Sequence, residues 1–315
     1  MIRMTVAPSR LMLTLIALLS LGPSLTDARG QPKACDSEIR PIDVNQTTLH
    51  YFECGNGEPL VFVHGGLGDL HTFQPQVQTF ATRFRVIAYS RRFSPPNAPP
   101  RETDVNPLSN HVADLGALIT QLKATPPHLV GNSYGAYVAL ALAMANPELV
   151  RSLVLGEPPV MPLLSRTSVG EGMRQSWIRR VNEPSRKAFE GGSLEDGLRT
   201  FQDAICGKPG CFDNFPQARR TELVEKQAPE LRSQFMTERS AYMPSLDCGS
   251  LGKLTRPMLL VTGERSPAML LLITAELERC VEGESQVMVP EAGHTMHREN
   301  TAFYNQAVMA FLQRR

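Results

Sequence analysis

The sequence HLVGNSYGAYVALALAMANP, residues 128–147, reads as a buried strand, a sharp turn and a helix in immediate succession. The apolar run ends at Gly131, Ser133 follows between two glycines, and a helix of small residues begins at once. In such a turn Gly131 and Gly135 allow close packing, while the Ser133 hydroxyl projects above the end of the sheet. The pattern G-x-S-x-G arises by chance in roughly one chain of this size in ten, so its meaning depends on the surrounding sequence.

Short apolar runs and amphipathic stretches alternate on both sides of this segment. Apolar residues recur at spacings of three and four at Val112, Leu115 and Ile119, which is typical of a helix packed on one face. The predicted strands, which have the composition of strands buried on both faces, are residues 59–66, 84–90, 127–133, 151–157, 257–264 and 285–291. The alternation predicts an α/β fold with a mostly parallel central sheet and helices on both faces.

The alternation stops between Pro158 and about Ser250, where the sequence is polar and helical in character. We interpret this stretch as a helical cap inserted over the sheet. The predicted divisions of the chain are residues 1–28, a signal peptide; 29–157, the first part of the core; 158–250, the cap; and 251–315, the second part of the core.

Composition and charge exclude several classes of partner. The chain has 315 residues, of which 42% are hydrophobic, so it can bury a full core. Its formal charge is +1, with acids and bases spread along the sequence, and this leaves no electrostatic footprint for nucleic acid or for an anionic membrane. We therefore expect a small-molecule substrate, and neither nucleic acid nor a membrane as a partner. The oligomeric state stays open.

The N-terminal residues have the order of a secretory signal peptide. Arg3 and Arg10 give a positive start, an apolar stretch covers residues 11–22, and small and polar residues run to Ala28. A membrane anchor is the alternative, but about a dozen apolar residues are short for a span that needs roughly 20. We expect a secreted or periplasmic protein after cleavage of residues 1–28.

Six cysteines, an even number in an exported chain, indicate disulfide bonds. The alternating pattern over residues 38–54 predicts a β-hairpin, and a two-residue turn at Val44 and Asn45 would place Cys35 directly opposite Cys54. We therefore predict a bridge between Cys35 and Cys54.

The other four cysteines form two further predicted bridges. Cys206 and Cys211 flank GKPG, a turn sequence that can close a small loop. Cys248 and Cys280 remain as the last pair, and both precede late predicted strands. A metal site at Cys206 and Cys211 is the alternative, but no second ligand pair accompanies them at finger-like spacing.

Two further stretches place polar groups at strand ends. LVFVHGGLGD, residues 60–69, sets a histidine and two glycines after a buried strand, where the backbone N–H of Gly66 can face Ser133. VMVPEAGHTMHREN, residues 287–300, sets His294 in a loop between the last predicted strand and the last predicted helix. The chain order is therefore serine first and histidine second.

With this order the sequence resembles the α/β-hydrolase fold enzymes from about Leu49 to the C-terminus, apart from the insertion, which falls where that family carries its cap. The resemblance implies an α/β-hydrolase fold in which Ser133 is the nucleophile and His294 the general base. It also implies an oxyanion hole formed by the backbone N–H groups of Gly66 and Tyr134. We expect no cofactor and no metal.

The carboxylate that should orient His294 is displaced from its usual place. The family supplies it after the strand at residues 257–264, at the position of Ser266, whose hydroxyl cannot bear the charge. Two glutamates are candidates: Glu264 lies on the same loop, and Glu157 directly follows the next strand after the nucleophile helix, where some family members carry the acid. We favour Glu157, because an ionisable residue between an apolar strand and two prolines needs a functional reason.

Three other polar residues have simpler interpretations. A zinc pair of His294 and His297 lacks a third ligand, so we interpret His297 as structural or solvated. Arg91 and Arg92, on a long proline-rich segment at residues 90–107, could line the mouth of a pocket, but we interpret them as solvated loop residues.

These residues predict an exported serine hydrolase that forms an acyl-enzyme, with a small ester or lactone as the favoured substrate. Serine rather than aspartate at position 133 argues against the dehalogenase and epoxide-hydrolase branches of the family. GNSYG and HGGLGD also resemble the carbon–carbon bond hydrolases, so that activity stays open, as do aminopeptidase and acyltransferase activities. A non-catalytic binding protein that keeps the fold is the alternative from another class, and only Ser266 at the usual acid position supports it.

Overall fold

Within the residues that the structure describes, eight strands form one sheet in the order β1-β2-β4-β3-β5-β6-β7-β8. This computed structural model describes residues 38–244, 246–281 and 285–314, all of which belong to the second of the two units of the chain, residues 32–315. The predicted signal peptide, residues 1–28, lies outside the described residues. The strands are β1 (Arg40–Val44), β2 (Thr47–Cys54), β3 (Glu58–Val63), β4 (Phe84–Tyr89), β5 (His128–Asn132), β6 (Ser152–Gly156), β7 (Met258–Gly263) and β8 (Ser285–Val289).

The sheet is mostly parallel, as the alternation of the sequence predicts. All six predicted strands are present, as β3 to β8, and each pairs in parallel with its neighbours among these six. Only the hairpin of β1 and β2, and the pairing of β2 with β4, are antiparallel. The carboxyl ends of β3, β5, β6, β7 and β8 therefore meet at one edge of the sheet, where the loops that follow them can build a shared site.

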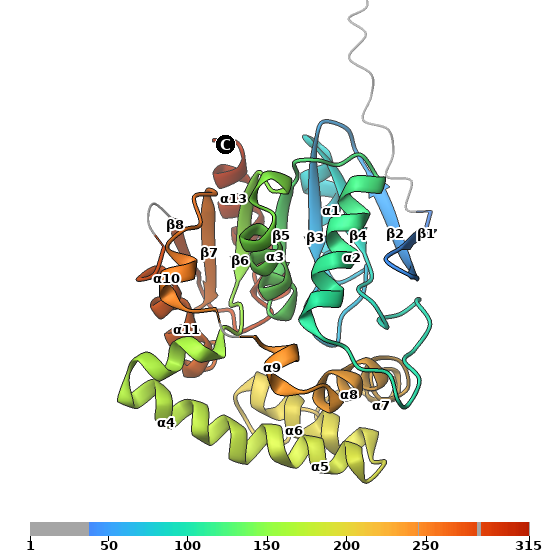
Figure 1. The fold of residues 1–315 in the computed structure, drawn as a ribbon, viewed down its shortest axis with the longest axis vertical. Helices are drawn as coiled ribbons and strands as arrows, with labels where there is room; N and C mark the ends of the chain where they lie inside the picture. The colour runs from blue at the N-terminus through green and yellow to red at the C-terminus, as the bar shows by residue number, and fades with distance from the viewer. Residues whose placement is uncertain (1–37, 245, 282–284, 315) are drawn as a thin grey trace, which may run out of the picture. The chain divides into compact units, whose positions relative to one another are not determined.

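Helices cover both faces of the sheet because the strand residues alternate between two apolar clusters. Val61 and Val63 pack in one cluster with α2, α3 and α11, whereas Leu60 and Phe62 pack in the other with α1 and α13. Figure 1 shows α2 and α3 in front of the strands. The core helices are α1 (Gln74–Ala81), α2 (Leu108–Gln121), α3 (Tyr134–Ala145), α11 (Ala268–Glu278), the short α12 (Met296–Glu299) and α13 (Thr301–Leu312), with a 3₁₀ turn η1 (Pro147–Leu149).

Two features of the sheet differ from the prediction. β8 is not buried on both faces, because it lies at the edge of the sheet, where Ser285 and Gln286 are exposed and Met288 is 52% exposed. The hairpin turn lies at Asn45 and Gln46, one residue later than predicted, and both residues have positive φ. A β-branched valine resists positive φ, whereas asparagine tolerates it, so the predicted turn was placed one position too early.

The described residues between β6 and β7 form helices joined by turns and loops, and they include no strand. Four of its helical elements, α5, α6, η4 and α8, pack around an apolar cluster that includes Phe189, Leu198 and Phe235. Figure 1 shows α4 to α9 gathered at one end of the sheet, whereas α10 lies beside β7. We call residues 158–250 the insertion; its boundaries as a cap stay a prediction. Its elements are η2 (Met161–Arg166), α4 (Ser168–Trp177), η3 (Ile178–Asn182), α5 (Glu183–Glu190), α6 (Leu194–Cys206), α7 (Gln217–Glu222), η4 (Leu223–Gln227), α8 (Ala228–Met236), α9 (Arg239–Tyr242) and α10 (Cys248–Leu251).

Two of the predicted cysteine pairs are joined in the structure. Cys206 and Cys211 have Cα atoms 6.3 Å apart, and Cys248 and Cys280 have Cα atoms 4.9 Å apart. The second bridge ties α10, at the end of the insertion, to the residues after α11. Cys35 lies outside the described residues, and the corrected turn removes the register argument that set it opposite Cys54. That bridge stays a prediction.

The two observed bridges should contribute unequally to stability. The Cys248–Cys280 bridge spans 32 residues, and a chain-entropy model gives about 3–4 kcal/mol for a loop of that length. The Cys206–Cys211 bridge spans 5 residues, for which the same model gives about 2 kcal/mol. We expect the double serine variant at 248 and 280 to lose more unfolding free energy in chemical denaturation than the matched variant at 206 and 211. Equal losses, or the reverse order, would contradict this expectation.

Candidate active site

Ser133 occupies a strained turn between β5 and α3. Its φ of 54° and ψ of −128° are unusual for a residue with a side chain, and such strain persists only where the surroundings enforce it. The Ser133 N–H donates to the Gly156 carbonyl at 2.7 Å, which ties the turn to the end of β6. A methyl group on Gly131 would lie 2.6 Å from the Ala136 Cα, and one on Gly135 would overlap the Val63 carbonyl oxygen. Both glycines are therefore required for the turn to pack.

Glu157 and His294 form a buried hydrogen-bonded pair. The His294 Nδ1 lies 2.6 Å from the Glu157 Oε2, and the Glu157 Oε1 accepts the Gly263 N–H at 2.8 Å. The side chain of His294 is 7% exposed and that of Glu157 is 0% exposed. A carboxylate only accepts hydrogen bonds, so the His294 Nδ1 carries the proton and, in the neutral ring, the Nε2 is left as an acceptor.

The loop that carries His294 is held against the Ser133 turn. The Asn132 Nδ2 donates to the His294 carbonyl at 3.5 Å. Glu157 directly follows β6, whose last residue, Gly156, accepts the Ser133 N–H. The structure thus brings the predicted nucleophile, base and favoured acid to the same edge of the sheet, on the loops after β5, β6 and β8.

The other candidate acid points elsewhere. Glu264 is exposed, and its Oε2 accepts the Glu291 N–H at 2.7 Å. Ser266, at the position where the family usually carries the acid, is buried, and its hydroxyl has no hydrogen-bond partner among the described residues. Of the two glutamates considered from the sequence, Glu157 is the one that the geometry places on His294.

The turn after β3 passes beside Ser133. A methyl group on Gly65 would lie 3.0 Å from the Ser133 Cβ and 3.7 Å from its Oγ, whereas one on Gly66 would meet no atom within 4 Å. His64 is buried beneath this turn, and its burial, with the nearby Arg91 cation, holds its pKa well below the ordinary value. The His64 ring is therefore neutral. The predicted oxyanion donor Gly66 thus borders open space next to the nucleophile.

Two residues of this region were missed by the sequence interpretation. Arg91, interpreted as a solvated loop residue, is 1% exposed and donates to the carbonyls of His64 and Gly65. Glu230, on α8 of the insertion, lies 3.3 Å from the Arg91 Nη1. The signal for Arg91 is its place two residues after the end of β4, at the edge of the sheet where the other site residues meet. Glu230 had no such signal, because its partner is 139 residues away in sequence.

The sequence matches the model of the Alpha/beta hydrolase family over residues 60–307. The chain belongs to this family. It is 26% identical to Epoxide hydrolase 3 of Mus musculus over 285 residues, which are 87% of this chain and 76% of that protein. It is 28% identical to Uncharacterized hydrolase YraK of Bacillus subtilis (strain 168), but this match covers only 39% of the chain and 45% of the relative.

Solved structures show the same fold. A thermophilic esterase from Thermogutta terrifontis superimposes with a TM-score of 0.66 over 88% of this chain and 98% of that one, at 21% identity. At this identity the likeness concerns the fold alone. It agrees with the family match in showing an α/β-hydrolase fold.

His297 is structural rather than solvated. Its ring is buried with the rings of Phe73 and Tyr304 at centroid distances of 4.7 and 6.1 Å, and neither ring nitrogen has a hydrogen-bond partner among the described residues. Burial lowers the pKa of His297 to about 3, so this imidazole is neutral. In the described part of the chain no group of three or more histidines, cysteines, aspartates or glutamates is placed to hold a metal ion.

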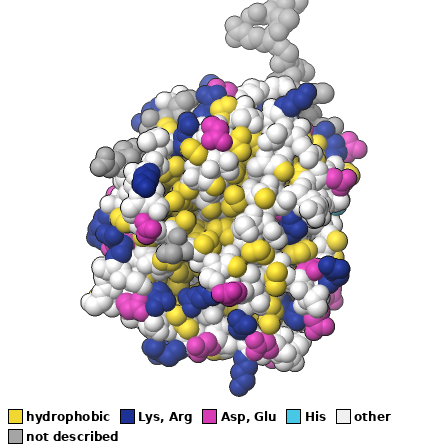
Figure 2. Space-filling model, viewed as in Figure 1, with side chains coloured by type: hydrophobic (Ala, Val, Ile, Leu, Met, Phe, Trp, Pro, Cys, Tyr) yellow, Lys and Arg dark blue, Asp and Glu magenta, His cyan; other side chains and the backbone are white. Residues whose placement is uncertain are grey.

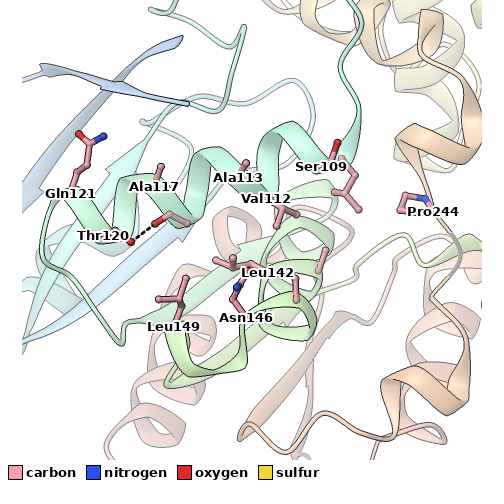
Figure 3. Close-up of a pocket in the computed structure, with 14 residues that line it drawn as sticks. Ser109, Val112, Ala113, Ala117, Thr120, Gln121, Leu142, Asn146, Leu149 and Pro244 are labelled. Atoms are coloured by element: carbon pink, nitrogen blue, oxygen red, sulfur yellow. Dashed lines mark hydrogen bonds between the residues drawn. The ribbon is translucent and has the colours of Figure 1, made fainter. Parts of the chain in front are cut away.

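A separate apolar groove lies between α2 and α3 on the outside of the molecule. It has a volume of about 670 Å³, and its lining includes Val112, Ala113, Leu142 and Leu149, with Pro244 at one end, as Figure 3 shows. Figure 2 shows apolar side chains gathered on this face. None of the predicted catalytic residues lines it.

In the described residues, no helix has the length and hydropathy needed to span a membrane.

The Ser133 turn yields a direct test of packing. Gly135→Ala would drive a methyl group into the carbonyls of Val63 and His64, so α3 must shift away from β3. We expect a loss of unfolding free energy of about 3 kcal/mol or more, together with loss of activity. Gly172→Ala is the matched control, because that glycine lies exposed in α4 with nothing near its Cβ position, and it should stabilise by about 0.5–1 kcal/mol. Equal stability of the two variants would contradict the packing argument.

Proposed function

We propose that this α/β hydrolase is an exported serine hydrolase that forms an acyl-enzyme on Ser133, with a small ester or lactone as its substrate. The observation that carries the proposal is the buried pair of His294 and Glu157, fixed by the Gly263 N–H and held next to the Ser133 turn. A serine hydroxyl is a weak nucleophile until a base takes its proton, and this pair supplies such a base.

The proposed reaction uses these residues in turn. The His294 Nε2 takes the Ser133 hydroxyl proton as the oxygen attacks the substrate carbonyl, and the Glu157 charge stabilises the imidazolium that forms. The backbone N–H groups of Gly66 and Tyr134 hold the oxyanion of the tetrahedral intermediate. The imidazolium then gives its proton to the departing alcohol oxygen. Water, deprotonated by the same imidazole, releases the acid and restores the serine hydroxyl.

The alternatives of the same fold differ in the bond that is broken. Carbon–carbon bond hydrolase, aminopeptidase and acyltransferase activities would use the same nucleophile and base. Serine at position 133 continues to argue against an epoxide-hydrolase mechanism, although one relative is an epoxide hydrolase. A non-catalytic binding role has one supporting feature, the serine at position 266 where the family usually carries the acid. The contact between Glu157 and His294 removes this support, so that role is disfavoured.

Export is supported by the order of the N-terminal residues and by the two joined cysteine pairs. Processing of the full chain during secretion is the direct measurement. N-terminal sequencing of exported protein that begins near residue 29 would agree with the proposal.

Ser133→Ala should abolish turnover of p-nitrophenyl acetate while leaving the folded state intact, because the variant has no hydroxyl to acylate at the turn. The wild-type protein should be labelled covalently by a fluorophosphonate at Ser133, as located by peptide mass spectrometry, and the variant should not be. Turnover by Ser133→Ala near the wild-type level would remove the nucleophile assignment. Absence of labelling in the folded wild-type protein would favour a binding protein.

Glu157→Gln should keep the shape of the side chain while losing the charge that stabilises the His294 imidazolium. In a related triad the matching change lowered kcat about 10⁴-fold, and we expect a loss of similar order. Glu264→Gln is the matched control, since its carboxylate faces the Glu291 N–H, and it should change kcat less than about threefold. Steady-state kinetics on the two variants distinguishes them. A crippled Glu264→Gln beside an active Glu157→Gln would return the acid to the loop after β7.

A further inference from the structure

A buried cation connects the insertion to the turn that carries the predicted oxyanion donor. Arg91, two residues after the end of β4, has a fully buried side chain, and its Nη1 lies 3.3 Å from the Oε1 of Glu230 on α8. The same glutamate oxygen accepts hydrogen bonds from the Asn106 Nδ2, at 3.3 Å, and from the Gln234 side chain. Burial of a charge is costly unless it is paired and hydrogen-bonded, so these contacts hold both ions in place.

The other side of the guanidinium holds two successive carbonyls of the turn. The Arg91 Nε donates to the His64 carbonyl and its Nη2 to the Gly65 carbonyl, each at 3.0 Å. The rigid fork of arginine can serve both acceptors at once. The guanidinium also lies over the ring of Tyr134, 5.1 Å from its centroid, and Tyr134 supplies the second predicted oxyanion donor.

His64 adds a third donor to the same turn. The backbone N–H of Arg91 donates to the His64 Nε2 at 2.9 Å, so the ring proton must be on Nδ1, which lies 2.8 Å from the Gly65 carbonyl oxygen. The Gly65 carbonyl therefore accepts from both the Arg91 guanidinium and the His64 ring. Its direction is fixed from two sides.

That carbonyl shares a peptide unit with the Gly66 N–H. A trans peptide is planar, and its C=O and N–H point in opposite directions, so fixing the Gly65 oxygen also fixes the direction of the Gly66 hydrogen. Donors on the carbonyl oxygen polarise the amide and strengthen its N–H as a donor. This peptide lies directly beside Ser133, because the Cβ position of Gly65 is 3.7 Å from the Ser133 Oγ.

The insertion contacts the turn a second time, through Leu67. This residue has a φ of 56°, and its side chain packs on the apolar cluster of the insertion that includes Phe189 and Phe235. The residues on both sides of the Gly66 N–H are thus held by groups that belong to the insertion or are paired with it.

We propose that Arg91 is a positioning residue that directs the Gly66 N–H toward the oxyanion. We further propose that, through Glu230, this direction depends on the position of the insertion relative to the turn. The inference rests on the proposed serine hydrolase function. In this proposal Glu230 affects catalysis through Arg91 and does not itself contact the substrate. A merely structural Arg91–Glu230 pair would affect stability but not the relative binding of the substrate and the tetrahedral intermediate.

The test compares Arg91→Lys and Arg91→Met with the wild-type protein. Removal of one oxyanion donor costs roughly 10²–10³ in kcat, so misdirection of that donor should lower kcat by about 10- to 100-fold. We expect KM for p-nitrophenyl acetate to change little and the affinity for an alkyl boronic acid, which forms a tetrahedral adduct on serine, to fall in parallel with kcat. Arg91→Lys should retain more activity than Arg91→Met, because lysine keeps the positive charge. It should still be less active than the wild-type protein, because an ammonium lacks the guanidinium fork that serves both carbonyls.

Arg92→Met is the matched control. Arg92 also pairs with a buried carboxylate, Asp114, at 2.6 Å, but its hydrogen bonds go to Asp114 and the Asn45 carbonyl rather than to the turn. This variant should lower the thermal unfolding midpoint while its boronic acid affinity stays within about twofold of the wild-type value. Arg91 variants that bind the boronic acid as tightly as Arg92→Met would overturn the proposal.

Glu230→Gln tests the link to the insertion and covers the case in which Arg91→Met does not fold. It leaves the turn contacts of Arg91 available but removes the charge that anchors the guanidinium, so kcat and boronic acid affinity should both fall, by less than in Arg91→Met. Unchanged values would remove the insertion from the proposal. Wild-type protein that a fluorophosphonate fails to label would overturn the proposed function and this inference together, whereas normal wild-type labelling beside unaffected Arg91 variants overturns the inference alone.

Discussion

The carboxylate of Glu157 is the constraint around which the candidate site is organised. It is fully buried, and its two oxygens are used by the His294 ring and by the Gly263 N–H. A buried carboxylate without such partners would be strongly destabilising, so the ends of β6, β7 and β8 must keep one register. The pairing of Gly156 with Val261, and the bond from the Glu157 N–H to the Val261 carbonyl, maintain it.

Much of the fold could be predicted because its signals are local. Each buried parallel strand is a continuous apolar run, and the strand, turn and helix around Ser133 occupy one short stretch. The preference for Glu157 was also local, since it depended on an acid placed between an apolar strand and two prolines. The hairpin turn lies at Asn45 and Gln46 because both turn positions have positive φ, which the alternation of apolar residues does not indicate. The exposure of β8 follows from strand order, which periodicity does not report either.

Arg91 marks where a single sequence stops being informative. Charged residues in a proline-rich segment are usually solvated, and nothing local distinguishes Arg91, which is buried, from Arg92, whose side chain is 13% exposed. The difference depends on a carboxylate from α8, which only the tertiary fold brings near. Both Ser133 and Glu157 also have positive φ directly after neighbouring parallel strands, a shared distortion that composition does not reveal.

The displaced acid changes how the insertion relates to the proposed chemistry. An acid after β7 would follow the insertion in sequence, whereas Glu157 is the last residue before it begins. The insertion therefore begins one residue after Glu157, whose carboxylate contacts His294, and through Glu230 it reaches back to the turn that carries Gly66. The predicted general base is oriented from the residue just before this helical segment, and the predicted oxyanion donor is linked to α8 within it. A displacement of that segment would act on both, so the insertion is a part of the proposed catalytic arrangement.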